Sequence, residues 1–141
     1  MYTAAALAMR YEENIEKALV AGLLHDCAKP FSTNLEHAKL GAQYAKDRYG
    51  VEDSYITDAI YYHTTGRPNM TLLDKIVYIA DYIEPNRNKA PNLESVRYMA
   101  FHNIDQCLCM ILEATMEYLN TTCEDIDPLT EQTYMYYKRR L

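Results

Sequence analysis

A histidine, an aspartate and a lysine lie close together in the segment Leu23-Leu24-His25-Asp26-Cys27-Ala28-Lys29-Pro30. Residues 18–24 are almost all apolar, so we expect a largely buried helix that carries His25 and Asp26 and stops before Pro30. A buried carboxylate is unfavourable unless it is paired, hydrogen-bonded or bound to a metal. Neighbouring helical side chains lie about 100° apart, close enough for His25 and Asp26 to hold one ion. A simple hydrogen-bonded pair would explain these two residues equally well.

Three further polar side chains are expected at helix ends or on apolar helix faces: His37, His63 and Asp81. A single histidine in such a place is more often a cap or a half-buried surface residue than a ligand. Several such groups against apolar stripes would, however, leave unsatisfied partners unless they share an ion. Imidazole and carboxylate groups suit a divalent transition metal such as iron, manganese or zinc, and helices present them rigidly. The sequence therefore favours a metal site.

Helix caps and apolar periodicity indicate how these side chains are positioned. The expected capping residues, in chain order, are Asn14, Asn34, Asp53 and Thr71 with Asp74. The helices that they begin carry, in the same order, His25 with Asp26, His37, His63 and Asp81. The helix with His37 is expected to end at Gly50, and further helices are expected over about 1–10, after Asn92, over 101–119 and over 130–141. No convincing segment alternates with period two, so the fold class is all-α, a helical bundle.

The bulk composition bounds the class of protein. With 141 residues, of which 49% are hydrophobic, the chain can bury one sizeable core and is expected to form a single domain over 1–141. No apolar run approaches the ~20 residues of a membrane span, so we expect a soluble, cytoplasmic protein with no membrane partner. The net charge of −6 argues against nucleic-acid binding. The four cysteines lack zinc-knuckle spacing and are expected to be reduced.

Three motifs together resemble a known family. They are His-Asp-x-Ala-Lys at His25, the loop His-Thr-Thr-Gly-Arg-Pro at His63, and Ala-Asp-Tyr-Ile-Glu-Pro-x-Arg ending at Arg87. The order of these motifs resembles the HD superfamily of metal-dependent phosphohydrolases, and within it the bacterial YqeK type, the symmetrical diadenosine tetraphosphate hydrolases. The resemblance runs over nearly the whole chain. It implies an all-helical domain that holds iron, with manganese or zinc as alternatives, and hydrolyses diadenosine tetraphosphate into two molecules of ADP.

The resemblance also implies a role for individual residues. The metal ligands would be His25, Asp26 and Asp81. The catalytic residues would be Asp26, Lys29 and His63. The residues that contact the nucleotide and its phosphates would be Asp26, Cys27, Ala28, Lys29, His37, His63 and Arg87. In related HD enzymes two histidines can hold a second metal, so His37 and His63 have an alternative role. Gly66 is expected to let the loop after His63 approach a ligand, whereas Arg67 and Lys89 are interpreted as ordinary solvated charges.

One departure from the family pattern concerns the beginning of the chain. The family's metal site includes a histidine on the helix before the His-Asp helix, in a segment that would precede Met1, so the first helix is expected to be truncated. Three alternatives follow. The chain could be another HD enzyme that acts on a nucleoside monophosphate or a guanosine alarmone, a non-catalytic nucleotide-binding module, or a structural bundle without metal. A homodimer is compatible with the sequence.

Overall fold

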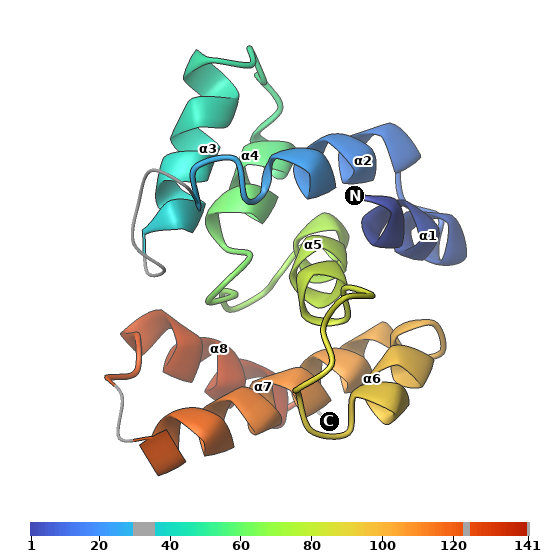
Figure 1. Cartoon of the computed structure of the whole chain (residues 1–141), viewed down its shortest axis with the longest axis vertical. Coiled ribbons are helices and arrows are strands. Elements are labelled where there is room, and N and C mark those ends of the chain that lie inside the picture. The colour runs from blue at the N-terminus through green and yellow to red at the C-terminus, as the bar shows by residue number, and fades with distance from the viewer. Residues whose placement is uncertain (30–35, 123–124, 141) are drawn as a thin grey trace.

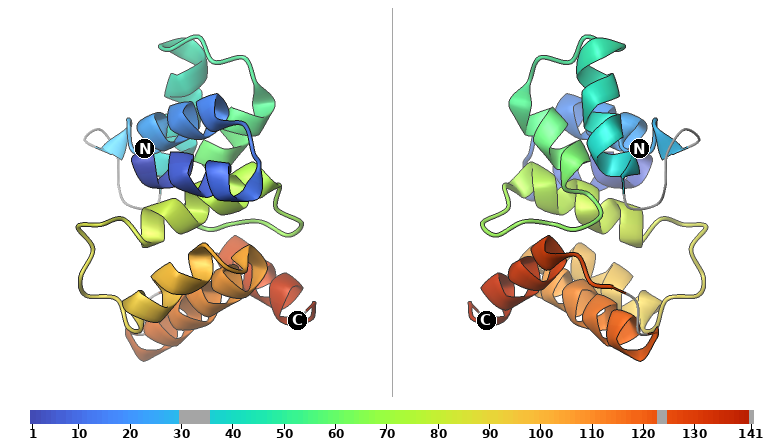
Figure 2. Two further views of the ribbon diagram at one scale, coloured as in Figure 1. Left: turned by 90° about the vertical axis from the view of Figure 1, so that its right-hand side faces the viewer. Right: turned by 90° about the vertical axis from the view of Figure 1, so that its left-hand side faces the viewer.

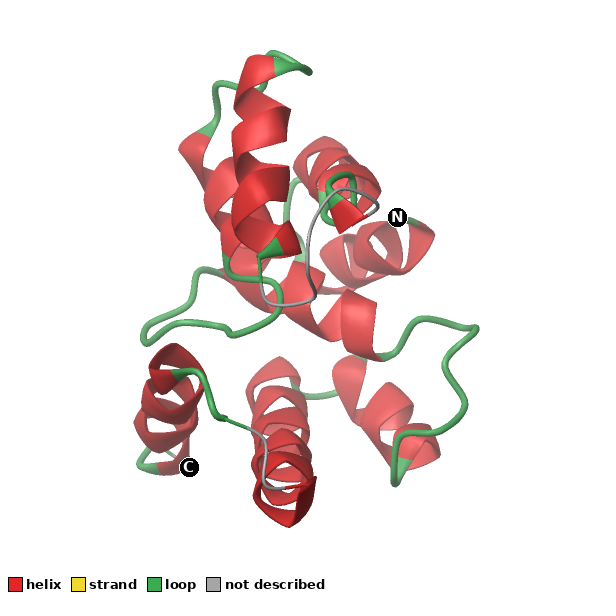
Figure 3. Cartoon of the chain, turned by 60° about the vertical axis from the view of Figure 1, so that its left-hand side comes forward, coloured by secondary structure: helices red, strands yellow, loops and turns green. Residues whose placement is uncertain are grey.

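The computed structural model describes residues 1–29, 36–122 and 125–140. These residues form helices joined by loops, with no strand among them, as Figure 3 shows. The helices are α1 (Tyr2–Tyr11), α2 (Ile15–Leu24), α3 (His37–Asp47), α4 (Ser54–Tyr61), α5 (Leu72–Tyr82), α6 (Leu93–Ala100), α7 (Ile104–Thr122) and α8 (Pro128–Lys138). The predicted all-α fold is confirmed. None of the described helices combines the length and the apolar character that a membrane span requires.

Helix α5 lies at the centre of the molecule (Figure 1). It contacts α1, α2 and α4 in one layer and α7 in the other, while α6 and α8 pack on α7. Its sequence explains this position, because apolar residues occupy several faces of the helix and Ile76, Val77 and Ile79 are almost fully buried. The last turn of this central helix carries Asp81, so that carboxylate is held by the best-packed element of the fold.

Three of the predicted caps are present. The Asn14 side chain accepts a hydrogen bond from the backbone N–H of Lys17 at 3.0 Å, and Asp53 caps α4 in the same way. Thr71 and Asp74 form the predicted capping box at the start of α5. The predicted cap Asn34 and one of the four cysteines, Cys123, lie outside the described residues.

The predicted end of α2 is wrong. The helix ends at Leu24, so that His25 is its C-cap and Asp26 lies in the turn that follows. In this turn the N–H of Cys27 donates to the carbonyl of Leu24, and the N–H of Lys29 donates to that of Asp26, both at 3.0 Å. Each of these bonds joins residues three positions apart, as in a 3₁₀-helix, and not four positions apart, as in an α-helix. Such tighter turns are common at the ends of α-helices. Asp26 is therefore presented by a turn and not by a helix face.

Helix α3 packs closely on this turn. At Gly41 an added Cβ would lie 3.4 Å from the carbonyl oxygen of His25, and the Cys27 thiol donates to the carbonyl of Gly41 at 3.6 Å. Ala38 and Ala42 of α3 are buried on the side that faces the rest of the fold. The helix ends at Asp47 and not at Gly50, because the last turn closes through Arg48 before the chain reverses.

The loop between α4 and α5 is tied to both layers of helices. Arg67 donates from Nε and Nη2 to the Oδ2 of Asp74, each at 2.8 Å, and only 1% of the Asp74 side chain is exposed. The interpretation of Arg67 as a solvated charge is therefore wrong: this cation neutralises a buried carboxylate. On the other side, the Tyr137 hydroxyl of α8 accepts a hydrogen bond from the N–H of Met70 at 2.7 Å.

Gly66 is required by packing on α8. Its φ is 70°, and an added Cβ would lie 2.8 Å from Cγ2 of Thr133. The group that approaches Gly66 most closely is thus a side chain of α8. The fold therefore requires a glycine here for packing, whereas the sequence indicated the approach of a ligand. Gly50 has a similar φ of 66°, but an added Cβ there would meet nothing within 4 Å.

This contrast gives a stability prediction. Gly50→Ala should cost about 1–2 kcal/mol, the ordinary penalty for a left-handed residue with a Cβ. Gly66→Ala should cost about 1–3 kcal/mol more, because the added methyl overpacks the contact with Thr133. Urea unfolding of the two variants measures the difference. Equal losses of unfolding free energy would show that the α8 contact yields without cost.

Candidate active site

Five of the side chains predicted from the sequence meet at one place. His25 and Asp26 come from the turn after α2, His37 is the first residue of α3, His63 follows the end of α4, and Asp81 lies in α5. His25 Nε2 is 3.2 Å from Oδ2 of Asp26 and 3.2 Å from Oδ1 of Asp81. Helices α2, α4 and α5 contact one another, which explains how residues 56 positions apart come within hydrogen-bond distance.

Asp26 is the centre of this cluster. While its Oδ2 faces His25, its Oδ1 lies 3.3 Å from Nε2 of His37 and 3.5 Å from Nε2 of His63. The two latter rings also face each other, with their Nε2 atoms 3.1 Å apart. One carboxylate therefore contacts three imidazoles, two of which belong to buried residues.

The backbone fixes which nitrogen of two rings faces the cluster. His25 Nδ1 lies 2.6 Å from the carbonyl oxygen of Gly22, and His63 Nδ1 lies 2.7 Å from that of Ile60. A carbonyl oxygen can only accept, so Nδ1 carries the proton in both rings. The Nε2 of a neutral ring then points a lone pair at carboxylate oxygens or at another ring nitrogen. This arrangement is unfavourable unless a proton or a metal cation lies between them.

Without a metal, the proton goes to His25. Burial lowers the pKa of this imidazole, but hydrogen bonds to Asp26 and Asp81 outweigh burial and raise the pKa to about 10. The hydrogen bond from the protonated His25 is the main reason that the pKa of Asp26 lies well below its ordinary value. Burial raises the pKa of the Asp81 carboxyl, yet the hydrogen bond to His25 leaves that pKa lowered overall. The cluster thus favours two carboxylates and one added positive charge.

The donor set fits a divalent metal. One ligand atom each from His25, Asp26 and His63 lies within 4.8 Å of the others, close to the span of atoms that share an ion at about 2.0–2.2 Å. Asp81 lies next to this group, because its Oδ1 is 3.2 Å from Nε2 of His25. Fixed Nδ1–H···O=C bonds are the usual outer support of histidine ligands, because they aim Nε2 and raise its basicity. His63 thus joins this geometric group, although the sequence favoured a phosphate-binding role for it.

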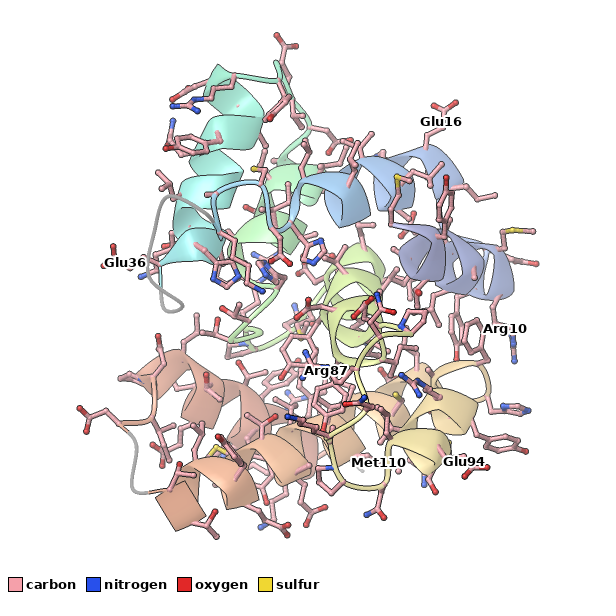
Figure 4. The ribbon with its side chains drawn as sticks, viewed as in Figure 1. Arg10, Glu16, Glu36, Arg87, Glu94 and Met110 are labelled. Carbon is pink, nitrogen blue, oxygen red and sulfur yellow. The ribbon has the colours of Figure 1, made fainter. Side chains whose placement is uncertain are left out.

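The remaining predicted site residues are placed at different distances from the cluster. Lys29 is near, with Nζ 4.0 Å from Oδ2 of Asp26 and 60% of its side chain exposed. Ala28 is fully buried, and the Cys27 thiol is bonded to α3, so both belong to the packing of the turn. Arg87 lies in the loop after α5, with its guanidinium 5.3 Å from the centre of the Tyr82 ring. Figure 4 shows Arg87 between α5 and α7.

Comparison with known proteins agrees with this site. Residues 1–86 match the family model for the HD domain. This chain belongs to the HD-domain family. The matched range covers α1 to α5 and therefore every helix that contributes to the cluster. Membership implies a divalent metal, which agrees with the histidine and carboxylate donors described above.

Individual relatives extend the match over nearly the whole of this HD-domain chain. It is 37% identical to a protein of Bacillus subtilis named symmetrical bis(5′-nucleosyl)-tetraphosphatase, over 95% of this chain and 83% of the relative. A protein of Halalkalibacterium halodurans with the same name is also 37% identical, over 95% and 82%. The crystal structure of a predicted HD superfamily hydrolase involved in NAD metabolism from Clostridium acetobutylicum matches with a TM-score of 0.92 and 33% identity, over 99% of this chain and 85% of that chain.

The cluster makes the stability of the metal-free HD domain depend on pH. His25 has a raised pKa, so its ion pairs contribute fully below its ordinary pKa of 6.5 and are lost as pH rises through about 10. The carboxylates have lowered pKa values, so their contribution is present above an ordinary pKa of 3.8 and is lost as pH falls. With chelator present, the temperature of the unfolding midpoint should decrease as the pH is raised from 7 to 10.

Added metal should reverse this dependence. A cation takes the place of the His25 proton, so the stabilisation by Mn²⁺ should grow over the same pH range. Thermal unfolding with chelator and with excess Mn²⁺ measures both trends. His25→Gln is the control, because it removes the titrating ring. An unchanged pH slope in that variant would place the titration elsewhere.

Proposed function

We propose that this HD domain is a metal-dependent hydrolase that cleaves diadenosine tetraphosphate symmetrically into two molecules of ADP. The observation that carries the proposal is the cluster in which Asp26 lies within 3.5 Å of the Nε2 atoms of three imidazoles, two of which are oriented by Nδ1 bonds to backbone carbonyls. Relatives that are 37% identical are named for symmetrical hydrolysis of bis(5′-nucleosyl) tetraphosphates, and this chain covers more than four fifths of their length.

The metal would be held by His25, Asp26 and Asp81, with His63 as a further ligand or as a neighbour of the phosphates. Iron is the proposed ion, and manganese and zinc suit the same mixed nitrogen and oxygen donors. When bound, such an ion acts as a Lewis acid that polarises a phosphoryl oxygen and activates water.

The residues around the metal ligands would bind and orient the reactants. Asp26 keeps an ionised carboxylate, so it can orient the attacking water as a hydrogen-bond acceptor. The resemblance to the family also implies that it could accept the proton of that water. Lys29 projects beside Asp26 into solvent, where its ammonium can neutralise a phosphate oxygen. His37 and Arg87, together with the backbone at Cys27 and Ala28, would complete the contacts to the phosphates. The charge that grows on the departing ADP would be stabilised by Lys29, His63 and Arg87.

A pocket of about 430 Å³ next to the cluster has room for a nucleoside. Two of its lining residues adjoin cluster residues in sequence: Ala38 follows His37, and Thr64 follows His63. Its other lining residues, from α3, α4, the following loop and the beginning of α8, are Lys39, Tyr61, Tyr62, Thr65, Arg67, Pro68, Asp127 and Leu129. Tyrosine rings and cations together suit an adenine base and its phosphates.

The decisive experiment is a product analysis. The chain is loaded with Fe²⁺ without oxygen, or with Mn²⁺ or Zn²⁺, and incubated with diadenosine tetraphosphate in ¹⁸O-water. Addition of one water across the central P–O–P bridge gives two ADP molecules, and one of them carries a single ¹⁸O on its β-phosphate. ADP should be the sole nucleotide product.

Other results would favour the alternatives. AMP together with ATP would exclude symmetrical cleavage. Faster turnover of a nucleoside monophosphate or a guanosine alarmone would indicate another HD phosphohydrolase. Metal-loaded protein that binds the nucleotide without cleaving it would indicate a binding module.

A further inference from the structure

A second pocket lies at the C-terminal end of α5, the helix whose last turn carries the proposed metal ligand Asp81. It has a volume of about 440 Å³ and lies between the end of α5, the loop 83–92 and the middle of α7. Tyr82, which follows the proposed ligand Asp81, lines its entrance together with Arg87. Lys89, Thr115 and Tyr118 line the rest, along with small apolar residues.

The charges of this pocket suit an anionic ligand. Only four of the chain's cations, Lys17, Lys29, Arg67 and Lys75, lie within 4.0 Å of a carboxylate oxygen among the described residues, so an unpaired cation is common here and the two in this pocket are notable for sharing one opening. Within the part of the chain that the structure describes, neither Arg87 nor Lys89 is paired with a carboxylate, although the protein as a whole carries a net charge of −6. Two uncompensated cations at one opening therefore mark a local attraction for phosphate.

The rings of this pocket suit a base. Tyr118, on α7, is 60% exposed and lines the pocket, and Tyr82 lies across from it with Arg87 over its ring. An exposed aromatic face beside phosphate-binding cations is the usual platform on which a nucleobase stacks. No periodic pattern along the chain predicts this pairing, because Tyr82 and Tyr118 come from different helices.

The wall of the pocket is held in place by Arg97 of α6. This side chain donates to the backbone carbonyls of Ile83, Glu84 and Arg87, at 3.2, 2.9 and 2.9 Å. Three bonds from one guanidinium fix the path of the loop that carries Arg87. The pocket is therefore preorganised, which lowers the entropic cost of binding a ligand there.

The two pockets are lined by loops from opposite ends of the central helix. Figure 2 shows the loop after α4, which lines the first pocket, at one end of α5 and the loop 83–92 at the other. Symmetrical cleavage places the reacting phosphorus at the middle of the four-phosphate chain, so the two halves of the substrate must leave the metal site in two directions. One pocket can hold only one of those halves.

We propose that the pocket of Tyr82, Arg87, Lys89 and Tyr118 binds the second nucleoside diphosphate half of the dinucleotide, with Tyr118 stacked on its base. The proposal rests on the proposed function and deepens it, because it explains why a dinucleotide would be preferred over a mononucleotide. Arg87 and Lys89 then bind the phosphates of this half, and the first pocket holds the other half.

The test compares two substrates that differ by one nucleoside. Diadenosine tetraphosphate fills both pockets, whereas adenosine 5′-tetraphosphate can fill only one and is hydrolysed at the same bridge to ADP and pyrophosphate. Tyr118→Ala should raise the KM for the dinucleotide about tenfold, within the range found for loss of one stacked base, and change that for adenosine 5′-tetraphosphate less than twofold. Tyr118→Phe keeps the ring and should retain the wild-type values.

Matched variants separate this effect from a general loss. Tyr49, outside both pockets, is 59% exposed, so Tyr49→Ala removes an equally exposed ring and should change neither KM. Lys89→Gln should raise both KM values, and less so at high salt, because it weakens attraction for phosphate. Metal content and thermal midpoint should be unchanged in all of these exposed-site variants.

The outcomes also separate this proposal from the proposed function. Wild-type protein that does not cleave diadenosine tetraphosphate to ADP overturns the proposed function and, with it, the second subsite. If the wild-type protein does cleave it to ADP, two results for Tyr118→Ala overturn the second subsite alone. One is wild-type KM values for both substrates, and the other is an equal rise in KM for both.

Discussion

Asp26→Asn is expected to remove both the bound metal and turnover. The two oxygens of Asp26 face different partners, with Oδ2 3.2 Å from Nε2 of His25 and Oδ1 3.3 Å from Nε2 of His37. An amide keeps the shape but loses the negative charge and puts an N–H₂ donor in place of one acceptor oxygen. Loss of an outer partner of a metal ligand already costs about 10- to 100-fold in affinity or activity, so loss of a central ligand should exceed that range.

The measurements are elemental analysis of the purified protein and the turnover rate at saturating metal. Asp58→Asn is a suitable control, because Asp58 is a half-exposed carboxylate that lies 3.6 Å from Arg67, outside the cluster. The control should keep both metal and activity. A stoichiometric transition metal together with full turnover in Asp26→Asn would show that the metal is held elsewhere.

Lys29→Ala is expected to lower kcat about a hundredfold while the metal content stays unchanged. Lys29 Nζ lies 4.0 Å from Asp26 Oδ2, and with 60% of its side chain exposed it belongs to the rim of the site and not to the packed cluster. Its charge can stabilise negative charge that grows on phosphate oxygens during bond cleavage, and loss of one such donor typically costs about 3 kcal/mol of the barrier. Because the interaction strengthens in the transition state, KM should change less than kcat.

Steady-state kinetics with diadenosine tetraphosphate, together with elemental analysis, test this prediction. Lys46→Ala, on the exposed side of α3, removes the same charge away from the site and should behave as wild type. If Lys29→Ala instead raised KM alone, Lys29 would bind the ground state and the transition state equally. If metal were lost as well, its role would be to support Asp26.

The sequence determined the local structure of this protein to a large extent. Asn14, Asp53 and the pair Thr71 and Asp74 were predicted as caps, and the structure confirms each of them. Capping and helical periodicity act between residues three or four positions apart, so a single sequence contains the whole interaction. The motifs around His25, His63 and Asp81 likewise indicated the kind of chemistry, because residue type alone limits which ions and charges a site can bind.

Only the tertiary structure decided how those groups meet. His25 reaches Asp81 across 56 positions, and no local pattern encodes that contact. The end of α2 at Leu24 and the burial of Arg67 against Asp74 also escaped prediction, because the first depends on a tightened turn packed on α3 and the second on a partner in the next helix. The second pocket is the clearest case, since its rings and cations come from α5, a loop and α7 and become one surface only when α7 packs on α5.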